Sequence, residues 1–213
     1  MIAISTAYKQ ALIAVDINGK RSEKMLDSSC AHSENILLTL DQMLDQMGYS
    51  IKDNRELAVV VGPGSFTGLR IALALAKGLS AGLDIEKIIP ITTFELMAYS
   101  YIRTFKPTDD FICVINGLSG HFFVCEYAQN GEKKEKERMV EREELSLIKL
   151  KTVGLEEERC AEVLIQPSPQ DLLEVAFQNR SHACDVKSIA PLYLRKSQAE
   201  DSLDEKLKKN NKI

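Results

Sequence analysis

The sequence lacks the residue patterns on which most catalytic and metal sites depend. Its three histidines, His32, His121 and His182, are scattered, and no pair has the i,i+4 spacing of a helical zinc site. The five cysteines are an odd number without a CxxC pair, which disfavours a disulfide framework or a zinc ribbon. No GxSxG nucleophile elbow is present. We therefore expect structural histidines and reduced, packed thiols, with no metal site and no catalytic residue.

The chain also lacks a surplus of positive charge. It has 27 Lys and Arg against 31 Asp and Glu, a formal net charge of −4 and a pI of about 5.5. A protein that grips a phosphate backbone usually carries a basic surface. Strong nucleic-acid binding by this chain alone is therefore disfavoured, although a partner could supply the positive charge.

A segment suited to a membrane is missing as well. Residues 1–6 have no basic region before a longer apolar run, so they do not resemble a signal peptide. The longest apolar stretch, residues 69–83, is too short for a bilayer span and contains Arg70 and Lys77. We expect a soluble, cytoplasmic protein that does not contact a membrane.

The hydrophobic pattern predicts alternating strands and helices. Three short segments joined by tight turns predict an antiparallel meander. Two further segments predict strands, and the first of these is apolar throughout, as is typical of a strand covered on both faces. In chain order these strands are residues 1–5, 10–17, 21–27, 57–61 and 88–91.

An amphipathic helix is predicted at residues 33–47, with Ser33 as its N-cap and Gly48 as its stop. Its apolar side chains fall on one arc of roughly 120° at 100° per residue. This arc comprises Ile36, Leu37, Leu40, Met43, Leu44 and Met47. Leu38 lies instead on the polar face. The acidic residues around it are Glu34, Asp41 and Asp45.

A boundary is predicted at residues 106–110, after a helix that Thr92 or Thr93 caps. Beyond it we expect strands at 111–115 and 121–128, a solvated mixed-charge hairpin tip or loop at 132–144, and a helix at 169–179. Two unequal α/β lobes fit this order best. They would comprise residues 1–106 and 107–195, followed by a mobile charged tail at 196–213.

A glycine-rich turn separates the strand at 57–61 from the next helix. Its residues are Gly62, Pro63, Gly64, Ser65, Phe66, Thr67 and Gly68. A strand, turn and helix in this order can bind phosphate, because free N–H groups and the dipole at a helix start favour an anion. The turn has neither the ending of a P-loop nor a GxGxxG pattern. Its glycines could equally serve a sharp turn and close packing, so both interpretations stay open.

The helix that follows the turn is apolar on nearly every side. At 100° per residue, one side holds Arg70, Leu73, Ala74, Lys77 and Ala81. The opposite side, which we expect to face the core, holds Ala72, Leu75, Leu79 and Leu83. A helix with so little polarity is normally buried, and small residues would allow another helix to approach closely. Either a neighbouring lobe or a partner chain could cover it.

Residues 61–71, continuing through 76–79, resemble the signature of the TsaB (YeaZ) family. Further matches lie at residues 2–6, 32–34 and 191–195. The resemblance implies a two-lobed actin-like ATPase (ASKHA, RNase H-like) fold, α/β with mixed sheets flanked by helices and with degenerate nucleotide machinery. It also implies a non-catalytic scaffold, not an enzyme by itself, that supports TsaD in transferring the threonylcarbamoyl group to adenosine beside the anticodon of tRNA.

The same resemblance implies a set of partners. TsaD would form a heterodimer with this chain, TsaE would be a further subunit, and the chain alone would form a homodimer. The tRNA would be contacted only through the complex. Pairing would use the helices at 32–47 and 67–82. No cofactor of its own is implied, although ATP or ADP could lie at the subunit junction.

Two departures from the family pattern bear on nucleotide chemistry. The opening strand usually ends in Asp, and this chain has Ser5, so the carboxylate that would organise a cation is absent. The second-lobe strand usually continues into an acidic turn, and here it reads Asn116-Gly117-Leu118. Both departures weaken an independent phosphotransfer role and leave a scaffold role intact.

We expect nine residues of the two helices to form the partner interface. They are Glu34, Leu38, Asp41, Asp45, Arg70, Leu73, Ala74, Lys77 and Ala81. The acidic side of the first helix should face basic residues, and Arg70 and Lys77 should face acidic ones, which sets orientation more than affinity. The apolar members should supply the dry contact.

Two other functions compete with the scaffold. A small-molecule kinase or ATPase of the actin-like superfamily would need a phosphate-organising carboxylate early in the chain, and Ser5 argues against it. A peptidase is the other, since relatives of this fold were long labelled glycoproteases. The lack of a paired-histidine metal motif argues against that activity.

Overall fold

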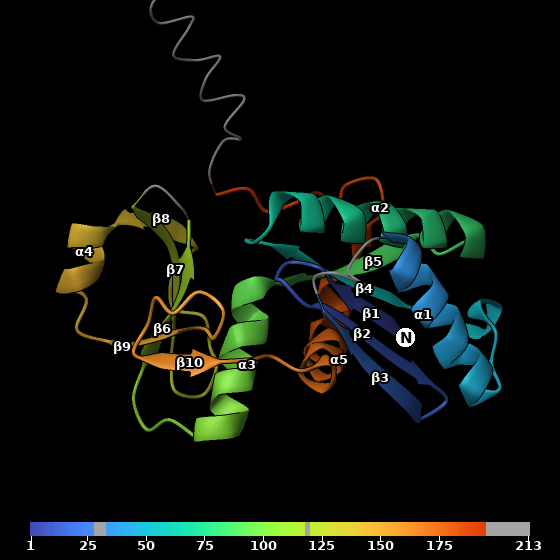
Figure 1. The fold of residues 1–213 in the computed structure, drawn as a ribbon, viewed down its shortest axis with the longest axis horizontal. Coiled ribbons are helices and arrows are strands. Elements are labelled where there is room, and N and C mark those ends of the chain that lie inside the picture. The colour runs from blue at the N-terminus through green and yellow to red at the C-terminus, as the bar shows by residue number, and fades with distance from the viewer. Residues whose placement is uncertain (28–32, 118–119, 195–213) are drawn as a thin grey trace, which may run out of the picture.

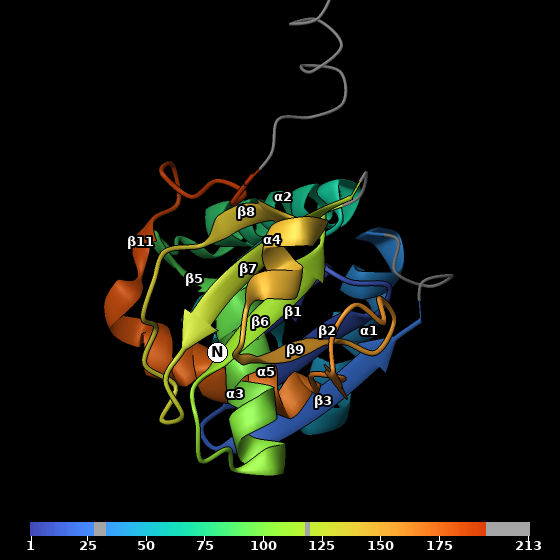
Figure 2. The ribbon, with the colours of Figure 1, turned by 90° about the vertical axis from the view of Figure 1, so that its left-hand side faces the viewer.

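The computed structural model describes residues 1–27, 33–117 and 120–194 and places them in two sheets flanked by helices (Figures 1 and 2). The side chains of Ser33 and Glu34 are outside this description. Cys30, His32 and the predicted tail at 196–213 also lie outside the described residues.

The first sheet has six strands in the order β11-β5-β4-β1-β2-β3. Its strands are β1 (Ile2–Ser5), β2 (Ala11–Ile17), β3 (Lys20–Leu26), β4 (Leu57–Gly62), β5 (Lys87–Thr92) and β11 (Cys184–Asp185). The predicted meander is confirmed, because β2 pairs antiparallel with both β1 and β3. β4 lies parallel to β1 and β5, and all of its residues are buried, as expected of a strand covered on both faces.

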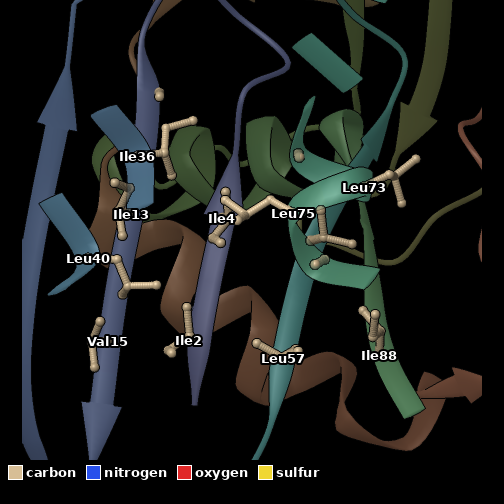
Figure 3. Close-up of a cluster of buried hydrophobic side chains, with 14 of the residues drawn as sticks. Ile2, Ile4, Ile13, Val15, Ile36, Leu40, Leu57, Leu73, Leu75 and Ile88 are labelled. Atoms are coloured by element: carbon tan, nitrogen blue, oxygen red, sulfur yellow. The ribbon is translucent and has the colours of Figure 1, made fainter. Parts of the chain in front are cut away.

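Helices cover both faces of the first sheet. On one face lie α1 (Ser33–Met47) and α2 (Phe66–Leu83), and on the other lie α5 (Pro169–Gln178) and α3 (Thr93–Phe105) (Figure 1). Figure 3 shows Ile36 of α1 and Leu75 of α2 packed over strand residues such as Ile4. Thr92 caps α3, since its side chain accepts the N–H of Glu95.

The second sheet has five strands in the order β10-β9-β6-β7-β8. Its strands are β6 (Phe111–Asn116), β7 (His121–Tyr127), β8 (Arg138–Glu141), β9 (Lys151–Leu155) and β10 (Val163–Ile165). α3 packs on one face through Phe94, Met97 and Tyr101, so this helix joins the two sheets. The short helix α4 (Arg142–Leu147) lies at the other face, beside β7 and β8.

The mixed-charge run at 132–144 begins in the connection between β7 and β8, as predicted for a hairpin tip or loop, but the prediction is wrong for residues 138–144. Residues 138–141 pair with β7 as the edge strand β8, and α4 begins at Arg142. Alternating charges suit this edge, because Val140 turns inward while its neighbours stay in water.

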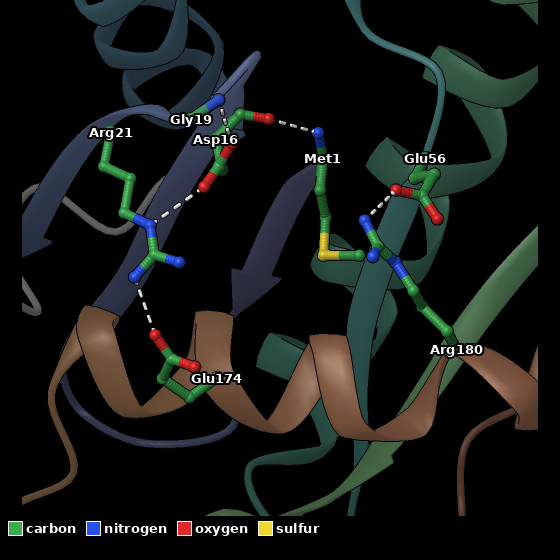
Figure 4. Close-up of polar contacts among 7 residues, drawn as sticks. All are labelled: Met1, Asp16, Gly19, Arg21, Glu56, Glu174 and Arg180. Carbon is green, nitrogen blue, oxygen red and sulfur yellow. Dashed lines mark hydrogen bonds and ion pairs between the residues drawn. The ribbon is translucent and has the colours of Figure 1, made fainter.

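The chain returns to the first sheet after β10, so the predicted second lobe at 107–195 extends too far. α5 packs against β1 and β2, the 3-10 helix η2 (Asn179–His182) follows it, and β11 joins the edge of β5. Figure 4 shows two ion pairs that join this returning segment to the first lobe. Arg21 of β3 pairs with Glu174 of α5 at 2.6 Å, and Arg180 pairs with Glu56 at 2.6 Å. A second 3-10 helix, η1 (Ile51–Asp53), precedes β4.

Candidate partner interface

The glycine-rich turn connects β4 to α2 and packs against the turn between β1 and β2. The N–H of Ser65 donates to the carbonyl oxygen of Ala7 at 2.9 Å, and Thr6 Oγ1 donates to the carbonyl oxygen of Gly68 at 2.5 Å. A Cβ on Gly68 would lie 1.9 Å from the Thr6 oxygen, and one on Gly64 would lie 2.5 Å from the Ala7 oxygen. Glycine is therefore required at both positions, because two backbones meet there.

This packing favours the structural interpretation of the turn over phosphate binding. The helix start is already capped, since the Ser65 side chain accepts the N–H of Gly68 at 3.2 Å. Ser5 is fully buried, and its hydroxyl accepts the N–H of Ala7 at 3.4 Å, so it offers no carboxylate to a cation. In the described part of the chain, no three His, Cys, Asp or Glu side chains gather into a possible metal site.

Three side chains form an exposed stack where α2 begins. The rings of Phe66 and Tyr193 are stacked with centroids 4.9 Å apart, and the Arg70 guanidinium lies 3.9 Å from the Phe66 centroid. Arg70 Nε also donates to the Tyr193 hydroxyl at 3.2 Å. Sequence reasoning placed Arg70 opposite an acidic partner residue and assigned Tyr193 no role. One signal in the sequence could have linked the two residues. Arg70 and Tyr193 lie in segments, 61–71 and 191–195, that resemble the same family.

The segment that carries Tyr193 is held against the turn itself. The N–H of Leu192 donates to the carbonyl oxygen of Val61 at 2.7 Å. A Cβ on Gly62 would lie 3.1 Å from the Leu192 carbonyl oxygen, and the φ of Gly62 is +116°. Only glycine suits this position, since both its backbone conformation and its surroundings exclude a side chain.

The outer face of α2 is exposed and made largely of small residues. Ala74, Gly78 and Ala81 are exposed along it, and Lys77 is the charge between them. Leu73 was predicted to join this face, and that prediction is wrong, because its side chain is 5% exposed and belongs to the core cluster. Leu73 lies about 60° from Arg70 around the helix, at the margin of the exposed arc, where the sheet still covers it.

The helix α1, which contacts α2, exposes two leucines. Leu38 is 57% exposed, as predicted for its polar side of the helix, and Leu37 is 45% exposed although the periodicity placed it in the core. Leu37 lies at the edge of the apolar arc, and the sheet covers only the centre of that arc. Exposed neighbouring apolar side chains on one face are typical of a surface that binds another protein.

Three charged side chains on the exposed sides of α1 and α2 make no ion pair within the described residues. Asp41 and Asp45 of α1 and Lys77 of α2 are exposed, and no ion pair between described residues includes them. Glu34 lies in α1, but its side chain is not described. A polar rim around small and apolar residues is the usual anatomy of a protein interface.

The length of α2 also corrects an expectation about membranes. It has 18 residues and is, by length and composition alone, apolar enough to cross a bilayer; it is the one such helix among the described residues. Six of its side chains are nevertheless buried in the protein. They are Leu69, Ala72, Leu73, Leu75, Ala76 and Ser80.

The thiols of Cys113, Cys125 and Cys160 show no sign of activation. Burial raises the pKa of Cys125 to about 11 and that of Cys160 to about 12, and it raises the pKa of Cys113 as well. A nucleophilic cysteine needs a lowered pKa. These thiols are therefore protonated near neutral pH.

Comparison with known proteins places the chain among tRNA-modification proteins. A family model described as TsaD, tRNA N6-adenosine threonylcarbamoyltransferase, matches residues 27–162. The tRNA threonylcarbamoyladenosine biosynthesis protein TsaB of Escherichia coli is 29% identical over 93% of this chain and 96% of its own length. The TsaB of Buchnera aphidicola subsp. Schizaphis graminum is 30% identical over 71% of this chain and 74% of its own length.

The structural comparison agrees with the sequence comparison. The structure of YeaZ from Pseudomonas aeruginosa superimposes with a TM-score of 0.75, over 91% of this chain and 98% of that chain, at 20% identity. This likeness confirms the two-lobed actin-like fold, with mixed sheets and flanking helices. From its fold and from the length and identity of these sequence matches, the chain belongs to the TsaB family.

Proposed function

We propose that this chain is a non-catalytic subunit in the biosynthesis of tRNA threonylcarbamoyladenosine, and that it binds a TsaD-type subunit through α1 and α2. The observation that carries this proposal is the outer face of α2, where Ala74, Gly78 and Ala81 are exposed, together with the exposed Leu37 and Leu38 of α1, a helix that contacts α2. The family membership supports the pathway, and the exposed face supports a partner.

The proposed partner is a relative of this chain. The TsaD family model matches residues 27–162, a range that includes both α1 and α2. A TsaD-type subunit would therefore carry two equivalent helices, and two related subunits can pair through like surfaces around an approximate twofold axis. Small residues on α2 would let the paired helices approach closely. Lys77, Asp41 and Asp45 would lie at the rim and set the orientation.

We extend the proposal to the rest of the assembly. The chain would work in the cytoplasm, form a homodimer through the same face when TsaD is absent, and meet TsaE in the complex. It would contact tRNA only through its partners, in keeping with its net charge of −4. Any nucleotide would bind at the junction with TsaD, since Ser5 supplies no carboxylate within this chain.

The interface can be tested with charges on the exposed face. We expect Ala74→Glu with Ala81→Glu to abolish co-elution with TsaD, because two unpaired charges would be buried at a helix contact. Both positions are exposed, so circular dichroism and the melting temperature of the variant should match those of the wild type. The affinity should fall at least about 100-fold.

The matched control adds the same charges to the opposite face of the sheet. Thr104→Glu with Gln170→Glu changes exposed positions of α3 and α5. This variant should co-elute with TsaD as the wild type does. If the α2 variant also co-elutes normally, the proposed interface is wrong.

A further inference from the structure

A short turn after β9 reaches from the second lobe to the first. The carboxylate of Glu157 accepts the backbone N–H of Lys9 with both oxygens, each at 3.2 Å. Lys9 belongs to the turn between β1 and β2, and β9 belongs to the second sheet. The contact therefore joins segments 148 residues apart in the sequence.

The turn that carries Glu157 is itself held by the second lobe. Its N–H groups at Glu158 and Arg159 both donate to the carbonyl oxygen of Leu155, at 3.0 and 3.3 Å. The next carboxylate, that of Glu158, accepts the N–H of Asn116 at the end of β6, at 2.8 Å. Glu158 thus holds the turn to the second sheet, while Glu157 contacts the first lobe.

Beside this contact the two lobes are only partly packed against each other, through Tyr8 of the β1–β2 turn, which packs against the core of the second sheet. A cavity of about 370 Å³ lies there, lined by Tyr8, Lys9 and Gln10 from the first lobe and by Glu157 and Gln166 from the second, among others. Gln166 Nε2 also donates to Gln10 Oε1 at 2.5 Å and to the sulfur of Met25 in β3 at 3.8 Å. Directional polar contacts therefore act beside the apolar contact of Tyr8 to define the lobe spacing at this edge.

We propose that the turn at residues 156–159 is a clasp, in which Glu157 holds the β1–β2 turn and fixes the orientation of the second lobe against the first. The turn it holds is also the one that packs on the start of α2, through Ala7 and Ser65. The clasp thus ties the second lobe to the segment that supports α2. This inference does not depend on the identity of the partner.

The test follows the Lys9 amide and the lobe orientation by NMR in the full chain. In Glu157→Ala, hydrogen exchange of the Lys9 amide should accelerate at least about fivefold, because its acceptor is gone. The Asn116 amide should keep its wild-type rate. Residual dipolar couplings of the two sheets should fit one alignment tensor in the wild type and require two of different magnitude in the variant.

Two further variants separate the clasp from a general effect of charge. Glu156→Ala removes an exposed neighbouring carboxylate that makes no side-chain hydrogen bond among the described residues, and it should leave both readouts unchanged. Glu157→Gln keeps one acceptor oxygen and should restore part of the Lys9 protection. The proposal is overturned if Glu157→Ala leaves the Lys9 exchange rate and the single tensor as in the wild type.

Discussion

Glu158 carries a carboxyl group that is largely removed from water. Burial raises its pKa from 4.5 to about 7, although the N–H of Asn116 and the thiol of Cys160 both donate to it and oppose the rise. The folded protein therefore holds a proton on Glu158 at pH values where the unfolded chain has released it. By linkage, this group lowers stability as the pH rises from about 4.5 to about 7.

Glu158→Gln should remove this dependence, because glutamine keeps an acceptor for the Asn116 N–H and cannot ionise. At pH 5 the variant and the wild type should have similar free energies of unfolding. At pH 8 the variant should be more stable by up to about 3 kcal/mol. Urea denaturation at both pH values measures the difference.

Glu162→Gln is the control, since Glu162 is exposed on the same segment. Its effect on the free energy of unfolding should be the same at pH 5 and pH 8. An advantage of Glu158→Gln that does not grow with pH would contradict this account of the buried carboxyl group.

At the scale of the element, two of the three glycines of α2 have opposite roles. Gly68 lies in its first turn, where a Cβ would meet the Thr6 carbonyl oxygen, and Gly78 lies on its exposed face, where a Cβ would meet nothing within 4 Å. The first glycine permits a backbone contact. The second makes no such contact, and it only increases the conformational freedom of the unfolded chain.

Replacing each glycine by alanine should therefore change stability in opposite directions. Gly68→Ala should cost about 2 kcal/mol or more, because the turn between β1 and β2 must move away. Gly78→Ala should add about 0.5 to 1 kcal/mol. Thermal denaturation of both variants measures the contrast. A similar loss in both would show that the Thr6 contact has no special importance.

The sequence correctly predicted that α1 and α2 are helices. It was less accurate about which of their side chains are buried. Local signals suffice for their existence, because caps, stops and 3.6-residue periodicity are written in neighbouring residues. Leu37 and Leu73 were misplaced because each lies at the margin of its apolar arc. Whether a marginal side chain is covered depends on the sheet and the adjacent helix, and periodicity does not contain that information.

At the scale of the whole molecule, the two lobes interleave along the chain. α3 packs against both sheets, and α5 returns to the first sheet. There the fully buried Asp171 side chain of α5 pairs with Arg103 of α3 at 2.6 Å. The sequence predicted the helix α5, which Ser168 caps, but not its place in the fold. Such a return depends on long-range contacts among helices and strands.

The strands β9 and β10 were missed for a related reason. β9 contains Lys151 and Gly154, so it resembles a loop, and its parallel partner β6 lies far away in the sequence. The clasp at Glu157 follows β9 directly and was missed with it. The exposed face of α2, in contrast, was open to prediction, because a small-residue stripe and its charges are local features.

The central claim is that this chain supports a TsaD-type subunit through the outer face of α1 and α2. The most direct measurement is the threonylcarbamoylation of tRNA by purified TsaD, with the other pathway components present, with and without this chain. The account predicts modification with the wild-type chain, little or none without it, and little or none with Ala74→Glu and Ala81→Glu. Equal modification without the chain, or with that variant, would contradict it.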